Sequence, residues 1–133
     1  MKVFVYGTLK PGGKYYHLYC AGKTIKEEKC WTYGNIYSLS LGYPAMTKGN
    51  GKVHGYLLTF PDAKALVNLD KLEGYQENRQ RELNDYQREK ITIYDYDNNP
   101  IKDVWTYFMD KDKIDYFQGV LVASGNWKDE NLR

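Results

Sequence analysis

Residues 2–13 constrain the fold more than any other part of the sequence, because an apolar strand pattern ends there in a glycine-rich turn. Residues 2–6 include Val3, Phe4 and Val5 in succession, which predicts a short strand. Three glycines and a proline follow within residues 7–13 and indicate a tight, irregular connection. We therefore expect a strand that leads directly into a loop with an exposed backbone.

The glycine-rich loop has two interpretations. If Gly7 adopts a positive φ, the backbone N–H groups of Thr8 and Leu9 converge and form a small anion site without a side-chain charge. Such a site would hold a carboxylate. The alternative is an ordinary turn between a strand and a loop, and local composition does not separate the two.

The remaining pattern favours an α+β fold, because predicted strands outnumber helices and do not alternate regularly with them. We expect short helical turns over 15–21 and a helix that begins near Pro61 and ends at Gly74. Extended structure is predicted over 24–41, interrupted near Gly34, and over 53–60. The turn at 97–100 predicts a hairpin between strands 90–96 and 101–109, and the polar stretch 76–85 is predicted to be a surface loop.

Composition limits the classes of protein that fit. A length of 133 residues predicts one domain over residues 1–133. A net charge of +2 gives no indication of a nucleic-acid or membrane partner, and no apolar run approaches the length of about 18 residues that spans a bilayer. The sequence predicts a cytoplasmic protein, in which Cys20 and Cys30 are buried free thiols.

No cofactor or metal motif is evident in the sequence. The spacing of His17, Cys20, Cys30 and His54 does not match that of close zinc ligand pairs. Residues 110–115 contain several aspartates but lack the glycine and the downstream glutamate of a calcium loop. Phosphate-binding and dinucleotide-binding loops are also not found. We therefore expect a protein without a metal or a cofactor.

Several short motifs occur together in a fixed order. They are Tyr-Gly-Thr-Leu at residues 6–9, Leu-Asp-Lys-Leu-Glu at 69–73, Tyr-Gln-Arg at 86–88 and Trp-Thr-Tyr at 105–107, with further segments at 32–39, 42–45 and 125–127. In this order the chain resembles the γ-glutamylcyclotransferase-like (AIG2-like) family. The resemblance extends over nearly the whole sequence.

The resemblance implies a small mixed β-barrel of about six strands with short outer helices. It also implies a transferase that releases 5-oxoproline from a small γ-glutamyl substrate, whose own α-amine attacks the γ-carbonyl in an intramolecular acyl transfer. By resemblance, Glu73 is the general acid and base. The substrate-binding residues implied by the resemblance are Tyr6, Gly7, Thr8, Leu9 and Tyr107, and Tyr43 and Pro44 would shape the opposite wall. Tyr107 either donates a hydrogen bond from the cavity wall or is a packed tyrosine of the barrel.

Glu73 requires a raised pKa for this role, because an ordinary glutamate is too weak a base for an ammonium group. Burial and the carboxyl end of a helix would both raise its pKa. The alternative is that Glu73 is a solvated residue at the end of a helix.

Two further hypotheses belong to other classes of function. The first is a non-catalytic module that binds a small carboxylate or amino-acid-like ligand. The second concerns residues 76–85, a longer segment than in compact family members, which would alter the leaving group or bind a protein partner. The alternative is that this segment is a tolerated surface insertion. Neither the leaving group nor the oligomeric state follows from the sequence.

Overall fold

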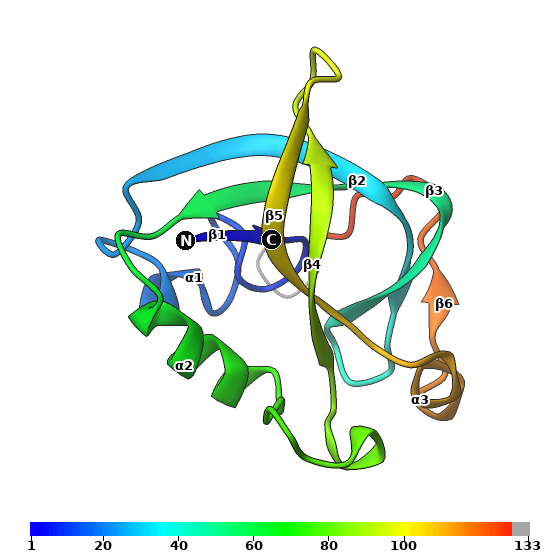
Figure 1. Ribbon diagram of the computed structural model, residues 1–133. Coiled ribbons are helices and arrows are strands. Elements are labelled where there is room, and N and C mark those ends of the chain that lie inside the picture. Colours follow the sequence, from blue (N-terminus) through cyan, green and yellow to red (C-terminus); the bar gives the residue numbers. More distant parts are fainter. Residues whose placement is uncertain (129–133) are drawn as a thin grey trace.

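A computed structural model describes residues 1–128, in which five strands close into a barrel (Figure 1). The strands are β1 (Lys2–Val5), β2 (Lys26–Ser38), β3 (Pro44–Thr59), β4 (Gln87–Tyr94), β5 (Pro100–Phe108) and β6 (Val120–Leu121). Their hydrogen-bonded order is β3-β1-β5-β4-β2, and β3 pairs again with β2 to close the barrel. The short β6 adds to β2 at Tyr37 and Ser38. Because β1 and β5 are parallel and the other pairs are antiparallel, the predicted small mixed barrel is confirmed.

Strand β1 is buried on both faces, which explains its uninterrupted apolar sequence. Phe4 and Tyr6 belong to a cluster built almost entirely of strand residues, which fills the barrel. Val3 and Val5 belong to a second cluster, which includes Leu66 from the longest helix and so lies between the barrel wall and the helices. Alternate side chains of one strand therefore join two cores.

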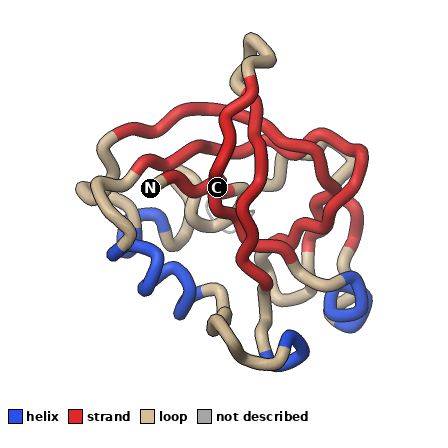
Figure 2. The backbone as a smooth tube through the Cα atoms, viewed as in Figure 1, coloured by secondary structure: helices blue, strands red, loops and turns tan. Residues whose placement is uncertain are grey.

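Strands β2 and β3 form the longest pairing in the barrel (Figure 2). Strand β2 runs through Gly34 without a break, but its register with β3 shifts between Tyr33 and Asn35, so the irregularity predicted near Gly34 is present as a change in pairing. The predicted start of the second strand at residue 53 is wrong, because pairing with β2 extends β3 back to Pro44. Gly42, with a φ of 92°, makes the tight turn between the two strands.

The helices are short and lie outside the barrel (Figure 2). They are α1 (Tyr16–Tyr19), α2 (Lys64–Leu72), α3 (Lys111–Tyr116) and the 3-10 turn η1 (Arg81–Leu83). Helix α2 begins later than predicted, because Asp62 accepts the Lys64 N–H through its side chain. Within residues 1–128 no helix has both the length and the apolar character needed to cross a membrane.

The hairpin of β4 and β5 projects beyond the rest of the barrel, and its prediction is confirmed with shifted ends (Figure 1). The Asp95 carboxylate accepts the N–H groups of Asp97 and Asn99 and so fixes the turn. Cys20 and Cys30 are both buried and free, as predicted. Burial raises the pKa of each thiol to about 12.

Candidate active site

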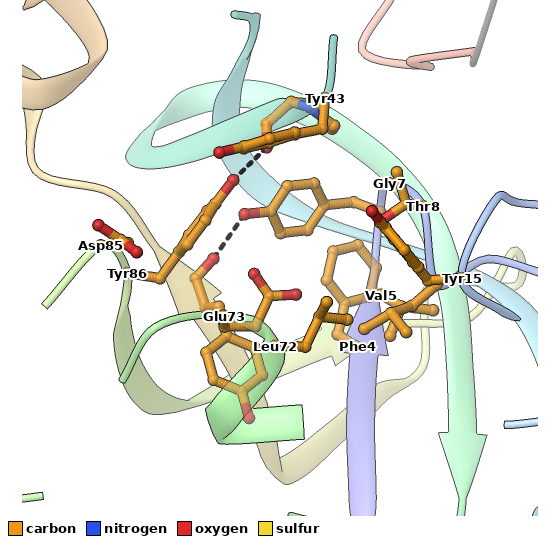
Figure 3. Close-up of a pocket in the computed structure, with 14 residues that line it drawn as sticks. Phe4, Val5, Gly7, Thr8, Tyr15, Tyr43, Leu72, Glu73, Asp85 and Tyr86 are labelled. Atoms are coloured by element: carbon orange, nitrogen blue, oxygen red, sulfur yellow. Dashed lines mark hydrogen bonds between the residues drawn. The ribbon is translucent and has the colours of Figure 1, made fainter. Parts of the chain in front are cut away.

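Tyr6 and Gly7 carry the chain out of β1 at the mouth of a cavity (Figure 3). The buried Tyr6 hydroxyl donates to the Tyr107 carbonyl oxygen at 2.6 Å and so ties the end of β1 to β5. Gly7 does not lie among the residues of positive φ, so the predicted positive φ is wrong. Glycine is required there by close packing instead, because a Cβ at Gly7 would lie 2.7 Å from Cγ of Pro44.

The loop after Gly7 leaves two backbone donors free. The Gly7 carbonyl accepts the Lys10 N–H at 3.1 Å, and the Thr8 carbonyl accepts the Tyr15 N–H at 2.9 Å. Within residues 1–128, the N–H groups of Thr8 and Leu9 donate to no protein acceptor. A loop whose carbonyls are occupied and whose N–H groups are not is suited to bind an anion.

Glu73 lies where α2 ends. Its N–H donates to the Leu69 carbonyl at 2.9 Å, and Gly74 then turns the chain with a φ of 62°. A side chain at residue 74 would also strike Asp85, since a Cβ there would lie 2.2 Å from Oδ2 of Asp85. The helix end therefore directs the Glu73 carboxyl group into the cavity, where it lies among Leu72 and the tyrosine rings (Figure 3).

The pKa of Glu73 is raised from 4.5 to about 8. Burial is the largest cause, because it disfavours the ionised form. The carboxylates of Asp70 and Asp85 add to the rise through repulsion between like charges. The sequence predicted that burial would raise the pKa of Glu73, but it did not predict the contribution of the two neighbouring carboxylates.

The cavity has a volume of about 170 Å³. One wall consists of β1 and the loop after it: Phe4, Val5, Tyr6, Gly7, Thr8 and Leu9. The other lining residues are Tyr15, Tyr43, Pro44, Leu72, Glu73, Asp85, Tyr86 and Tyr107. The structure thus brings all six of the predicted site residues to one cavity, together with Tyr43 and Pro44.

The charged lining residues are both acidic. They are Glu73 and Asp85. Among residues 1–128, no lysine, arginine or histidine lines the cavity. A carboxylate that enters can be bound only by neutral donors, such as the Thr8 and Leu9 N–H groups. An ammonium group is favoured on the side of the two acids. No group of three potential metal ligands occurs among the same residues.

One prediction about an individual side chain is corrected. Tyr107 was expected to donate into the cavity, but its hydroxyl donates to Oδ1 of Asp70 at 2.6 Å. The stretch 76–85 is mostly exposed, so the predicted surface loop is confirmed, except that Asn84 is buried and Asp85 lines the cavity. The segment folds back because the Asn84 side chain accepts the Gln76 N–H and the Arg79 side chain.

Three further residues that line the cavity, Tyr15, Asp85 and Tyr86, were not predicted from the sequence. The buried Tyr86 hydroxyl donates to the Pro44 carbonyl at 2.7 Å and holds two walls of the cavity together. Its position in the Tyr-Gln-Arg motif was the available signal. Asp85 had no such signal, because nothing in a charged stretch of sequence distinguishes the carboxylate that lines the cavity.

Comparison with known proteins identifies the family. The family model described as "Gamma-glutamyl cyclotransferase, AIG2-like" matches residues 3–129. The chain belongs to this family. A γ-glutamylcyclotransferase-family relative, the Halalkalibacterium halodurans protein named "Putative gamma-glutamylcyclotransferase BH1612", is 32% identical over 110 residues, which cover 81% of this chain and 90% of that protein.

Solved structures of similar proteins share the γ-glutamylcyclotransferase-like fold. The Escherichia coli protein ytfP is 26% identical with a TM-score of 0.64, and the match covers 98% of this chain and 99% of ytfP. An aig2-like protein from Mus musculus is 19% identical with a TM-score of 0.68, covering 97% of this chain and 88% of that one. YkqA from Bacillus subtilis gives a TM-score of 0.69 at 22% identity; the match covers 98% of this chain but only 40% of YkqA.

Proposed function

We propose that this protein is a γ-glutamylcyclotransferase that releases 5-oxoproline and an amine or amino acid from a small γ-glutamyl compound. One observation carries the proposal: a glutamate with a pKa of about 8 shares a small cavity with two free backbone donors. The donors suit the α-carboxylate of a γ-glutamyl group, and the glutamate suits its α-ammonium. Family membership supports the same class of activity.

The proposed reaction depends on holding the substrate so that its own amine and γ-carbonyl meet, and it needs no nucleophile from the protein. With the α-carboxylate at the N–H groups of Thr8 and Leu9, the α-ammonium lies toward Glu73. Glu73 takes one proton from the α-ammonium, and the neutral amine then attacks the γ-carbonyl. The attacking nitrogen releases a second proton to solvent, and the C–N bond to the leaving amine breaks as Glu73 returns its proton to that amine. Orientation of the two reacting groups contributes on the order of 7 kcal/mol or more in favourable cases.

The test is an assay of 5-oxoproline release from a panel of γ-glutamyl amines and γ-glutamyl amino acids. Release from at least one compound, with the free amine in equal amount, supports the proposal. Binding without any product across the panel would instead indicate the non-catalytic module. The panel also identifies the leaving group, which the cavity residues alone do not specify.

We expect the dependence of kcat/KM on pH to follow the ionisation of the Glu73 carboxyl group on its acidic side. Only the ionised carboxylate accepts a proton, so kcat/KM should rise with pH and level off above a midpoint of about 8. Below that midpoint it should fall about tenfold per pH unit, as for a single essential base. Steady-state rates between about pH 5.5 and 9 measure this, and a flat profile across that range would contradict the assignment of Glu73.

The glycine loop gives a prediction about binding. Gly7→Ala should weaken the binding of 5-oxoproline at least about tenfold, because its Cβ would force the loop away from Pro44 by contact at 2.7 Å. Thr8→Ala should bind within a few-fold of the wild type, since it keeps the backbone N–H. Isothermal titration calorimetry measures both, with circular dichroism to show that each variant is folded. Equal binding by Gly7→Ala and wild type would contradict the backbone site.

A further inference from the structure

Behind Glu73, outside the lining of the cavity, lies a largely buried ion pair. Nη1 of Arg88 donates to Oδ2 of Asp70 at 2.5 Å, and the two side chains are only 11% and 20% exposed. Asp70 belongs to α2 and precedes Glu73 by three residues, so both side chains lie on the same side of the helix end. The ion pair is therefore close to the proposed base without lining the cavity itself.

The surroundings of Arg88 hold it in place. Its guanidinium lies over the Tyr75 ring at 5.0 Å and the Trp105 ring at 4.5 Å. Its Nε is buried and has no acceptor among residues 1–128. A guanidinium stays charged at every physiological pH, so a permanent positive charge faces Asp70. Within residues 1–128, its only other carboxylate contact is at 3.9 Å with the exposed Glu77.

Asp70 is also joined to the cavity wall. Its second oxygen accepts the Tyr107 hydroxyl at 2.6 Å, and the Tyr107 carbonyl accepts the Tyr6 hydroxyl at 2.6 Å. Burial favours a protonated Asp70, whereas Tyr107 and Arg88 favour its carboxylate and offset part of the rise in its pKa. These contacts favour the carboxylate form of Asp70, three residues before Glu73.

Few other groups around Glu73 can supply charge. Asp85 faces it from the segment before β4, and this is the second carboxylate that repels its ionised form. The hydroxyls of four tyrosines complete the surroundings: Tyr6 directly after β1, Tyr43 in the β2–β3 turn, Tyr86 directly before β4, and Tyr107 in β5. All four have a pKa above the usual value, so they stay neutral.

We propose that Asp70 and Arg88 are positioning residues that set the pH at which Glu73 takes up and releases its proton. Arg88 keeps Asp70 ionised, and the Asp70 charge keeps the proton on Glu73 up to neutral pH. Without that charge, Glu73 would be a weaker base and less able to take a proton from an ammonium group. The role of this ion pair in catalysis rests on the proposed function, but its effect on the titration of Glu73 does not.

The test follows the titration of Glu73 directly. Protein labelled with ¹³C at the glutamate side-chain carboxyl carbon is titrated by NMR, and the Glu73 signal is assigned by its loss in Glu73→Gln. In Asp70→Asn we expect the midpoint of Glu73 to fall by about one pH unit, as for removal of a neighbouring like charge. Asp70→Glu keeps the charge and should restore a midpoint near that of the wild type.

Glu77→Gln is the matched control. Glu77 also contacts Arg88, but it is 72% exposed, so its removal should leave the Glu73 midpoint unchanged. An unchanged midpoint in Asp70→Asn, or an equal shift in Glu77→Gln, would overturn the proposal. A midpoint in Asp70→Glu as low as in Asp70→Asn would also overturn it, because charge would not then be the cause.

Arg88 is tested by the titration of its partner. With ¹³C label in aspartate, the Asp70 midpoint should rise by about one pH unit or more in Arg88→Met, and Arg88→Lys should keep it near the wild-type value. An Asp70 midpoint that does not move in Arg88→Met would overturn the role of Arg88. None of these readings needs turnover. They therefore stand even if no γ-glutamyl compound is a substrate, in which case only the proposed function fails.

Discussion

Glu73→Gln is expected to lower the rate of 5-oxoproline release by about 10²- to 10⁴-fold, the usual contribution of a general acid or base. The amide occupies nearly the same volume but cannot accept a proton from the α-ammonium. Because the Thr8 and Leu9 N–H groups are unaffected, affinity for 5-oxoproline should stay within a few-fold of the wild type. The measurement is product formation under single-turnover conditions, with the compound from the panel that turns over fastest.

Glu77→Gln provides the matched control for this experiment. It makes the same chemical change four residues later, at a carboxylate that is 72% exposed, and should leave the rate unchanged. Circular dichroism shows whether both variants are folded. Turnover by Glu73→Gln within a few-fold of the wild type would exclude Glu73 as the proton carrier.

Glu73→Gln is also expected to be more stable than the wild type at alkaline pH. The pKa of Glu73 is raised from 4.5 to about 8 in the folded protein, so its protonated form stabilises the fold at low pH. That contribution is lost as the pH rises through about 8, where the wild type must hold a buried charge and the glutamine variant does not. The pKa difference sets an upper bound of about 4 to 5 kcal/mol, at about 1.4 kcal/mol per unit.

The measurement is the free energy of unfolding from urea titrations of both proteins between about pH 5 and 9. The difference between them should be small at pH 5 and grow with pH. Glu77→Gln should show no such trend relative to the wild type, since its carboxylate is solvated. Parallel stability curves for Glu73→Gln and wild type would mean that Glu73 is not buried as a neutral acid.

Local sequence patterns predicted the elements whose causes are local. The apolar run of β1 and the turn after Asp95 each follow from residues close together in the chain. The closure of β3 on both β1 and β2 is different, because it depends on pairings between distant residues. Its start at Pro44 was missed although Pro44 pairs with Ser38, only six residues earlier in the chain.

In the candidate site, too, features with local causes were predicted and features that depend on the tertiary fold were missed. The motif at residues 6–9 and Glu73 were recognisable, but the reason for Gly7 lies in Pro44, a residue from another strand. The Asp85 carboxylate could not be singled out in a charged segment, because only the tertiary fold turns it toward Glu73. The direction of the Tyr107 hydroxyl likewise depends on Asp70, which belongs to a helix packed against its strand.

The placement of β1 between β3 and β5 has a consequence for synthesis of the protein. The first strand to be made pairs at Val3 with Leu58 on one side and with Trp105 on the other. At translation rates of about 5–20 residues per second, its apolar residues wait several seconds for their second neighbour. The cavity, which needs Tyr107 as well as Tyr6, cannot form on a nascent chain before β5 has emerged. Binding activity should therefore appear late in translation, although the glycine loop is among the first segments to be made.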